Sequence, residues 1–550
     1  MKYRAIFDDI DDAEEQERKG MSKTGKTLVV LGAGVFVFCL LAVLYVSLCR
    51  EIFYWSNADY WNMARRIASG ELDGQLWSTV YNSILTSEFN YIPALLSSVF
   101  IRLFGESRMV FILSLVICYL IPANILIYLT AKKIGKAPFI TTLIVIFTMP
   151  VTVYLTFNGF TEIGGFLMCI ACFYLYFKKN SAEPGLVRCV VIGVILAALM
   201  LWNNWYLFFS VSFITAMIAE AIIFRKRWYV RLAALAAMIA VVSFFFEGFM
   251  FQRLLASYGG GSFDFNVSEN MKLITRYIGL VFLVLLAASS VMIGIKYKEK
   301  RQVFIWLQLI VCYIMFTATQ THGQGHLLLY VPGFIMLLIL SVKYIHREQA
   351  LIVVFALALI HSVNIFIPRE QPKSTDEIRH VALFPNFSMQ PVTRDSAYDI
   401  LNLKTTLDNI VPEGQYLGVL AYSDTLNSEM LKNAEPSLNI EQRRIGYIAN
   451  TIPYFDIDSD NIEPLCNANY MLVAYPAQTI RSDQKVVETA VESFAYWTDI
   501  AMAYEEMYEY ETVIDDSVIK LYRRIRDVTD FEKATFRNRL RARISAAVQQ

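Results

Sequence analysis

Charged residues and cysteines are both scarce in this chain, and each scarcity excludes a class of protein. Only 18% of the 550 residues are charged, and 49 basic side chains balance 49 acidic ones. A chain without net charge has no general electrostatic attraction for nucleic acid. Of the eight cysteines only Cys466 lies beyond Ile367, so no disulfide framework is expected there. Cys169 and Cys172 form a CxxC pair, but it lies inside an apolar segment, which favours packing over a metal or redox role.

Hydrophobic residues are abundant instead. They make up 56% of the chain, and the mean hydropathy of +0.43 is too high for one soluble domain. Eleven apolar segments approach the length that crosses a bilayer, and a polar segment follows Ile367. We therefore predict a mainly α, polytopic membrane protein of about 11 transmembrane helices with a C-terminal extracytoplasmic α/β domain. The expected spans are 28–48, 109–130, 139–156, 162–177, 186–202, 205–223, 230–250, 273–295, 302–319, 326–342 and 350–367.

The distribution of Lys and Arg predicts how the chain lies in the membrane. The short connections 158–161, 203–204 and 320–325 contain neither residue. The connections after the even-numbered spans contain many, namely Lys132, Lys133, Lys136, Lys178, Lys179, Arg225, Lys226, Arg227, Arg231, Lys296, Lys298, Lys300, Arg301, Lys343 and Arg347. The positive-inside rule then places the N-terminus in the cytoplasm of a plasma-membrane protein, and an odd number of spans places the C-terminal domain outside.

The predicted organisation has three parts. Residues 1–26 form a cytoplasmic tail, residues 27–367 a transmembrane domain with a long first outer loop at 49–108, and residues 368–550 an extracytoplasmic α/β domain with a basic tail. Within the first outer loop, residues 56–70 predict a short helix lying on the membrane surface, with Tyr60, Met63, Ala64 and Ile67 on one face and Asn62, Arg65 and Arg66 pointing elsewhere. A second short apolar piece runs from Ile92 to Phe104.

Three stretches of the chain resemble a known superfamily. Residues 57–64 (Asn-Ala-Asp-Tyr-Trp-Asn-Met-Ala), residues 89–105, and residues 321–333 (Thr-His-Gly-Gln-Gly-His-Leu-Leu-Leu-Tyr-Val-Pro-Gly) are similar to the polytopic GT-C glycosyltransferases. That superfamily includes the protein mannosyltransferases and the bacterial aminoarabinose transferases. The resemblance covers residues 28–367 and implies a sugar donor linked to polyprenyl phosphate, with Asp59 as the base. Many relatives have a paired acidic motif here, whereas Ala58 precedes Asp59 in this chain, so a two-carboxylate mechanism is not implied.

The chemistry of glycosyl transfer independently directs attention to two carboxylates. Transfer to a hydroxyl needs a base for the acceptor proton and a group that stabilises the departing phosphate. Asp59 is the candidate base, although an N-cap role fits it as well. Tyr60 and Trp61 are candidate acceptor-binding residues, because aromatic rings stack on sugars, and interfacial anchoring explains them equally. Glu162 is the second catalytic candidate, with a helix-dipole role as its alternative.

Cations on the outer side are candidates for the donor phosphate. Arg253, Lys272 and Arg276 flank the glycine-rich stretch 259–261, and contact with lipid headgroups is the alternative. His326 is a candidate hydrogen-bond partner of the same phosphate, or else a capping histidine. His322 lies four residues before it, but the intervening glycines disfavour a helical metal site and no third ligand is evident. We therefore predict no cofactor; a divalent metal is unsupported. The stretch 202–205 (Trp-Asn-Asn-Trp) is interpreted as an aromatic belt with a tight turn.

The polar C-terminal segment predicts a small α/β layer. Strand-like runs at 415–422, 470–475 and 517–524 alternate with helix-like segments at 396–411, 426–434 and 484–511, which favours one parallel pair. This segment contains no nucleotide-binding glycine loop, HExxH or nucleophile elbow. The arginines between Arg523 and Arg543 suit contact with anionic polymer or lipid, and also suit a solvated charged helix.

The sequence therefore predicts a membrane glycosyltransferase. Its expected partners are a polyprenyl-phosphate sugar donor, membrane lipid, and a saccharide, lipid or protein acceptor of the cell envelope, without nucleic acid. A transporter or flippase of lipid-linked saccharide is the alternative from another class, and an envelope polysaccharide polymerase or ligase shares the donor. Transporters place polar residues near the bilayer centre, whereas the predicted spans here contain few, which favours the enzyme.

Overall fold

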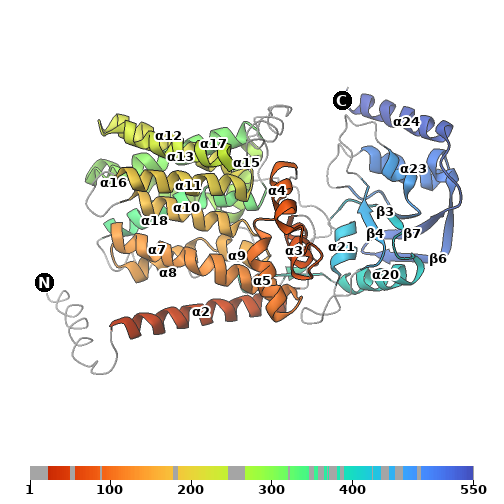
Figure 1. Ribbon diagram of the computed structural model, residues 1–550, viewed down its shortest axis with the longest axis horizontal. Coiled ribbons are helices and arrows are strands. Elements are labelled where there is room, and N and C mark those ends of the chain that lie inside the picture. The colour runs from red at the N-terminus through yellow and green to blue at the C-terminus, as the bar shows by residue number, and fades with distance from the viewer. Residues whose placement is uncertain are drawn as a thin grey trace.

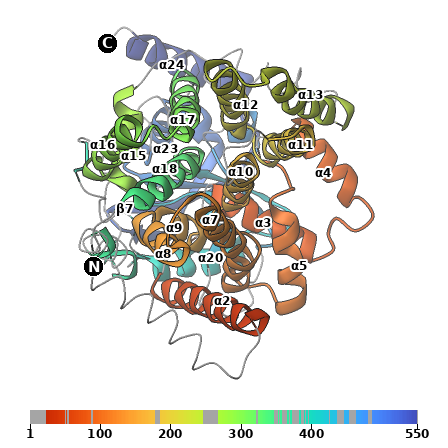
Figure 2. The ribbon, with the colours of Figure 1, turned by 90° about the vertical axis from the view of Figure 1, so that its left-hand side faces the viewer.

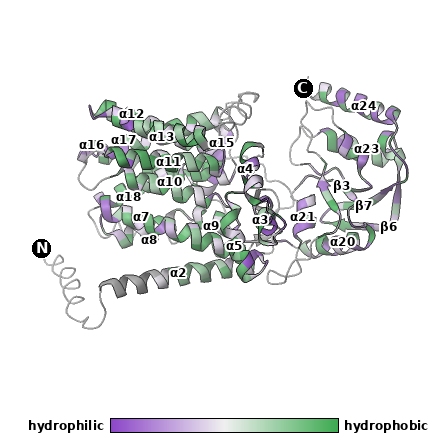
Figure 3. Cartoon of the chain, in the orientation of Figure 1, coloured by the Kyte–Doolittle hydropathy of each residue, from purple (hydrophilic) through white to green (hydrophobic). Residues whose placement is uncertain are grey.

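The computed structural model has a helical part and a C-terminal part built around a sheet (Figure 1). The structure describes residues 23–49, 52, 56–86, 89–177, 184–245, 267–319, 323–345, 352, 354–356, 364–367, 369–370, 381–383, 389, 391–394, 396–423, 425–434, 445–452, 462–479 and 485–548. Apolar residues dominate the helical part, and hydrophilic residues are concentrated on helix α3 and in the C-terminal part (Figure 3).

The helical part contains long helices and several short ones. Its elements are α2 (Lys23–Leu48), α3 (Ser56–Ala68), α4 (Leu76–Thr86), α5 (Ala94–Phe104), α6 (Arg108–Leu115), η1 (Val116–Leu120), α7 (Ile121–Ile134), α8 (Pro138–Thr148), α9 (Val151–Phe157), α10 (Ile163–Tyr176), α11 (Leu186–Trp202), α12 (Tyr206–Ile223), α13 (Trp228–Phe245), α15 (Val267–Ile278), α16 (Leu280–Tyr297), α17 (Arg301–Thr317), η3 (Gly325–Leu329) and α18 (Val331–Tyr344). Helix α2 lies at the edge of this part both in Figure 1 and in the end-on view of Figure 2, and its outer side exposes Phe36 and Leu40.

Within the described residues, three helices are long and apolar enough to cross a membrane by length and composition: Arg108–Ile134, Tyr206–Ile223 and Leu280–Tyr297. Helices α8 and α9 would add a fourth span as a pair, although they are bent by 63°. The remaining apolar helices are shorter, at 10–17 residues. Ten of the eleven predicted ranges coincide with one of these helices or with a broken pair, and most of the range 350–367 lies outside the described residues.

Three predicted spans are interrupted, which corrects the expectation of continuous helices. The range 326–342 consists of the 3-10 segment η3 and the separate helix α18. The range 139–156 breaks at Met149 and Pro150, because proline has no backbone N–H to continue the helix. The range 273–295 breaks at Gly279, whose φ of 86° lies in the left-handed region that glycine adopts without strain. The mean hydropathy stays high across the ranges 139–156 and 273–295, so hydropathy alone did not reveal these breaks.

Helix α3 confirms the short helix predicted over residues 56–70, and α5 covers most of the second short apolar piece, residues 92–104. Helix α3 is more deeply packed than expected. It packs against α5, and Ala58, Tyr60, Trp61 and Ala64 are buried. The prediction that Arg65 points away from the buried face is wrong: its side chain is only 6% exposed and pairs with Glu106. The guanidinium also lies over the ring of Trp61 at 5.2 Å, so the cation is held by charge and by the ring face.

The C-terminal part is built on a mixed five-stranded sheet of order β4-β3-β5-β7-β6. Strands β3 (Tyr416–Leu420), β4 (Ile448–Thr451) and β5 (Tyr470–Tyr475) are parallel, whereas β6 (Tyr504–Ile514) and β7 (Ser517–Arg524) form an antiparallel hairpin with β7 beside β5. The predicted α/β class and the three predicted strands are confirmed. The surrounding helical elements are α20 (Ala397–Ile410), α21 (Ser428–Asn433), α22 (Glu463–Asn467), α23 (Lys485–Tyr496), η6 (Asp499–Ala503) and α24 (Asp530–Val548).

The predicted helix over 484–511 is wrong beyond Tyr496. Residues 504–514 form β6 although they are rich in glutamate, because β7 pairs with both ends of this strand, on either side of a register shift between Glu506 and Glu511. Cross-strand ion pairs also place the glutamates, with Lys520 Nζ 2.8 Å from Glu506 Oε1 and Arg523 paired with Glu505. Arginines of the basic tail also form ion pairs within the C-terminal part. Arg539 and Arg543 of α24 both pair with Glu492 of α23.

Candidate active site

The carboxylate of Glu162 is buried at the start of α10. The residue is 5% exposed, and its Oε2 atom has no hydrogen-bond partner among the described residues. Its main chain is held firmly, because the hydroxyl of Tyr206 donates to the Glu162 carbonyl oxygen at 2.7 Å. Leaving a buried acceptor unsatisfied costs about 1–3 kcal/mol, and more for a charged group. This arrangement is the one expected of a carboxylate that receives a proton or a ligand.

Two aromatic side chains pack against the start of α10, because two glycines let them approach it. A Cβ atom on Gly164 would stand 2.2 Å from the ring of Trp202, and one on Gly165 would stand 2.1 Å from the ring of Tyr206. The indole N–H of Trp202 donates to the Thr161 carbonyl oxygen at 3.2 Å. A larger residue at Gly164 or Gly165 would displace the ring of Trp202 or Tyr206 from α10.

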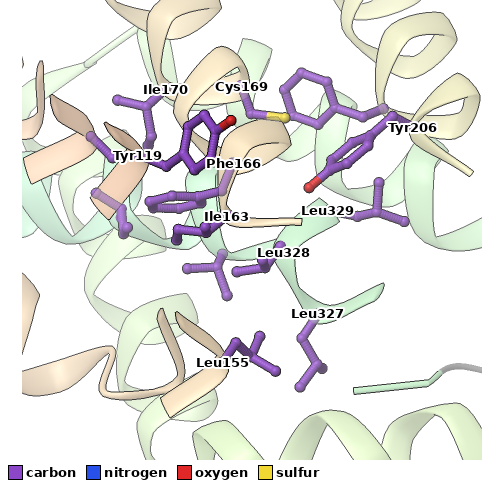
Figure 4. Close-up of a cluster of buried hydrophobic side chains, with 14 of the residues drawn as sticks. Tyr119, Leu155, Ile163, Phe166, Cys169, Ile170, Tyr206, Leu327, Leu328 and Leu329 are labelled. Atoms are coloured by element: carbon purple, nitrogen blue, oxygen red, sulfur yellow. The ribbon is translucent and has the colours of Figure 1, made fainter. Parts of the chain in front are cut away.

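An apolar cluster packs η3 against α10, the helix that Glu162 precedes. Ile163, Phe166 and Ile170 of α10 lie in one buried cluster with the three leucines 327–329 of η3 (Figure 4). Tyr119, which belongs to the π-helical segment η1, lies beside Phe166 in the same view. The cluster fixes η3 against α10 and so fixes the residues at the start of η3 relative to Glu162.

His326 is held in a defined orientation next to Gly325. Its Nδ1 atom accepts a hydrogen bond from the Gly323 amide at 2.7 Å. Its ring packs between Trp205, with centroids 4.9 Å apart, and Phe316, with centroids 4.8 Å apart. Since Nδ1 acts as the acceptor, a neutral His326 carries its proton on Nε2 and can donate from that side. His322 and Arg253 lie outside the described residues.

Asp59 occupies the first turn of α3 and is half-buried. Its neighbour Tyr60 connects α3 to the Glu162 region, because Asn203 Nδ2 lies 3.5 Å from the Tyr60 hydroxyl. Asn203 directly follows Trp202, whose indole contacts Thr161. The two predicted catalytic carboxylates thus belong to elements that contact the same α11–α12 connection.

Tyr60 and Trp61 do not present open ring faces. Both are 1% exposed, and they pack against Phe89 and Phe111 with ring centroids 5.7 and 5.5 Å apart. Sugar stacking requires an accessible ring face, which neither residue offers. In this structure both rings have a packing role that anchors α3, and their acceptor-binding role stays a prediction.

The two described cations of the predicted donor site differ in their partners. Both lie on α15, which stands at the same end of the helical part as α3 and α4 (Figure 1). Lys272 Nζ lies 2.6 Å from Glu269 Oε1. Arg276 is half-buried, forms no ion pair within the described part of the chain, and has a buried Nε atom without a hydrogen-bond partner. Arg276 is therefore the better placed of the two to receive an anion.

The residues that pack around the start of α10 were not predicted as site residues from the sequence. Trp202, Asn203 and Trp205 were interpreted as a membrane-interface belt, and Tyr206 was not singled out. Two asparagines between two tryptophans at an outer turn were the available signal. Across the described residues, no group of three or more His, Cys, Asp or Glu side chains is placed to hold a metal ion.

Comparison with known proteins shows similarity in structure. No protein-family model and no curated protein sequence matches the chain. Among solved structures, the chain shares its fold with ArnT, as the predicted resemblance implied. One similar structure is that of ArnT from Cupriavidus metallidurans bound to undecaprenyl phosphate, with a TM-score of 0.55, 10% identity, and coverage of 91% of this chain and 98% of ArnT.

Two further structures are similar to different degrees. ArnT in the apo state matches with a TM-score of 0.54 and the same identity and coverage. The oligosaccharyltransferase of Archaeoglobus fulgidus in complex with Zn and sulfate matches at 12% identity over 79% of this chain and 67% of its own, with a TM-score of 0.39. At such identities the similarity to ArnT establishes a common fold.

Proposed function

We propose that this protein is a membrane glycosyltransferase that moves a sugar from a polyprenyl-phosphate carrier to an extracytoplasmic acceptor of the cell envelope. The observation that carries the proposal is the buried Glu162 carboxylate with an unpartnered oxygen, which adjoins Gly325 of the η3 turn that orients His326. The ArnT fold supports the same conclusion, because ArnT itself was crystallised with undecaprenyl phosphate.

In the proposed reaction Asp59 is the general base. An acceptor hydroxyl gives its proton to the Asp59 carboxylate while its oxygen bonds to the anomeric carbon of the sugar. The bond between that carbon and the phosphate oxygen breaks, and polyprenyl phosphate leaves with the bonding electron pair. Glu162 stabilises the positive charge that develops on the sugar ring.

The leaving phosphate is held by donors from two elements. His326 donates from Nε2, and Arg276 contributes the guanidinium that lacks an ion-pair partner. Lys272 is a weaker contributor because Glu269 shares its charge. Arg253 remains a predicted phosphate ligand.

The proposed orientation follows from the basic connections. The C-terminal ends of α7, α12, α16 and α18 lie at the end of the helical part remote from the sheet, and each is followed by or ends in Lys or Arg (Figure 1). With that end in the cytoplasm, α3, α15 and the C-terminal part lie at the outer surface of the plasma membrane. An acceptor saccharide, lipid or protein then arrives from outside while the polyprenyl tail of the donor remains in the bilayer.

Substitution of Asp59 tests the proposal directly. The purified protein in lipid is incubated with a panel of polyprenyl-phosphate sugars, and release of the carrier is measured. Asp59→Asn keeps the capping ability of the side chain but removes its basicity, so activity should fall at least about a hundredfold without loss of thermal stability. Asp73→Asn, an exposed residue of the same loop, is the matched control. Activity of Asp59→Asn within a few-fold of the parent would contradict the assignment.

A further inference from the structure

The two parts of the molecule are joined at the helix that carries Asp59. Asn62 Nδ2 of α3 donates to Glu429 Oε2 of α21 at 3.0 Å, a contact between residues 367 positions apart. Figure 1 shows α3 and α21 facing each other across the boundary between the helical part and the C-terminal part. Ile52, four residues before α3, is also buried within the apolar core of the C-terminal part beside Ile400 and Leu417.

The geometry of α3 places Asp59 and Asn62 on the same side. Successive residues of an α-helix are about 100° apart, so positions 59 and 62 differ by only about 60° around the axis. The buried residues Trp61 and Ala64 lie on the opposite side, which packs into the helical part. The side of α3 that carries Asp59 is therefore the side that the C-terminal part contacts.

Glu429 is itself fixed by the sheet. Its carboxylate also pairs with Lys432, with 2.8 Å between Nζ and Oε1. Helix α21 is capped by Asn427, whose Oδ1 accepts from the Met430 amide at 3.0 Å, and the Ser428 amide donates to Thr451 Oγ1 of β4 at 2.8 Å. The acceptor of the Asn62 hydrogen bond thus belongs to a rigid part of the C-terminal domain.

We propose that the C-terminal domain is a positioning element of the active site, and that Glu429 acts through Asn62 to set the rotation of α3 and hence the direction of the Asp59 carboxylate. The proposal rests on the proposed function, since it gives Asp59 a role in catalysis. The buried side of α3 anchors the helix, and the hydrogen bond between Asn62 and Glu429 restrains it against turning about its axis. Glu429 is a positioning residue because it contacts neither substrate nor the reacting atoms.

Reciprocal exchange of the two side chains provides the test. In Glu429→Ala the acceptor is lost, and in Asn62→Asp two carboxylates face each other, so each change should lower kcat about tenfold while the KM for the donor stays unchanged. In the double variant Asn62→Asp with Glu429→Gln, the amide and the acid are exchanged, so the hydrogen bond runs in reverse and kcat should return to within about threefold of the parent. Hydrogen exchange of residues 56–68, measured by mass spectrometry, should accelerate in the single variants and recover in the exchanged pair.

A matched control and the contrary outcomes separate this proposal from the proposed function. Glu463→Ala removes an acid of the same domain that pairs with Lys533, and it should change neither kcat nor exchange in α3. If the parent releases no carrier with any donor, the proposed function fails and the positioning role with it. If the parent is active, either of two results overturns the positioning role alone: a Glu429→Ala variant with the parental kcat, whatever its exchange, or an exchanged pair that stays as slow as the single variants.

Discussion

The carboxyl carbon of Glu162 lies 3.4 Å from the point at which a Cβ atom on Gly325 would stand. Glu162 precedes α10 and Gly325 opens η3, so the contact joins the two elements that we assign to the sugar and to the phosphate. The absence of a side chain at Gly325 leaves the carboxylate in its present rotamer. A larger residue there would contact the carboxyl group first.

Substituting Gly325 by valine should therefore act on Glu162. We expect kcat to fall by about tenfold or more, because a displacement of about 1 Å at a reacting group is enough to slow chemistry strongly. Overpacking should cost about 1–3 kcal/mol of stability, so the variant should still be purified in folded form. Carrier release by Gly325→Val is compared with that of Gly185→Val, a glycine with no atom within 4 Å of its potential Cβ. Equal activity of the two variants would contradict the contact's role.

Arg276 and Lys272 should differ in their effect on donor binding. Loss of a charge-assisted hydrogen bond costs about 1.5–3 kcal/mol, so Arg276→Gln should raise the KM for the donor by about ten- to a hundredfold. Lys272→Gln should have a smaller effect, because Glu269 already shares the charge of Lys272. Initial rates against donor concentration distinguish the two. A larger effect at Lys272 would place the phosphate about one helical turn closer to the N-terminus of α15.

The proposed orientation predicts which positions an impermeant thiol reagent can reach. A cysteine replacing Tyr508, which is 75% exposed in the C-terminal part, should be labelled in intact spheroplasts. A cysteine replacing Lys298, an exposed residue in the connection after α16, should be labelled only after lysis. The reverse pattern would invert the topology and place the proposed site on the cytoplasmic face.

The start of α24 should make the C-terminal part sensitive to acid. Arg526 donates to both carboxylate oxygens of Glu532, at 2.9 and 2.6 Å, and with the Thr529 amide and hydroxyl it lowers the pKa of Glu532 to about 2. A lowered pKa stabilises the folded state above the unfolded pKa of Glu, and this contribution is lost as the pH falls toward about 2.

The unfolding temperature of the C-terminal part measures this effect. Glu532→Gln should lower it near neutral pH, and the difference from the parent should shrink as the pH falls below about 4. Glu509→Gln, an exposed residue of β6, serves as the control and should change little at any pH. A difference that is constant with pH would show that the carboxylate charge does not contribute.

The helical layout could be predicted because it depends on local composition. Ranges such as 186–202 and 205–223 contain one charged residue each, Arg188 and Glu220, and are otherwise predominantly apolar, and α11 and α12 coincide with them. The breaks at Pro150 and Gly279 were present in the sequence but lie inside windows whose hydropathy stays high. Strand β6 was missed because its glutamates favour a helix locally, and the partner strand that overrides this preference follows after a turn.

The candidate site was predictable in its carboxylates but not in its surroundings. Asp59 was identified from its helix start and Glu162 from its place beyond a span, which are local signals. The burial of Tyr60 and Trp61 depends on Phe89 and Phe111, and the pairing of Arg65 depends on Glu106, some 41 residues away. Such contacts follow from tertiary packing, which one sequence does not reveal.

The break at Gly279 has a consequence for the order in which the molecule is completed. The first amides of α16 have no partner within that helix. The Leu280 amide donates to the Ala382 carbonyl at 2.9 Å and the Val281 amide to the Leu383 carbonyl at 3.0 Å, while the Ala382 amide donates to Thr275 Oγ1 at 3.2 Å. The ribosome therefore completes both helices that flank the break about a hundred residues before it reaches residues 382 and 383, which accept these hydrogen bonds. The α15–α16 elbow, and with it the placement of Arg276, reaches its final form only after residues 382 and 383 have been synthesised.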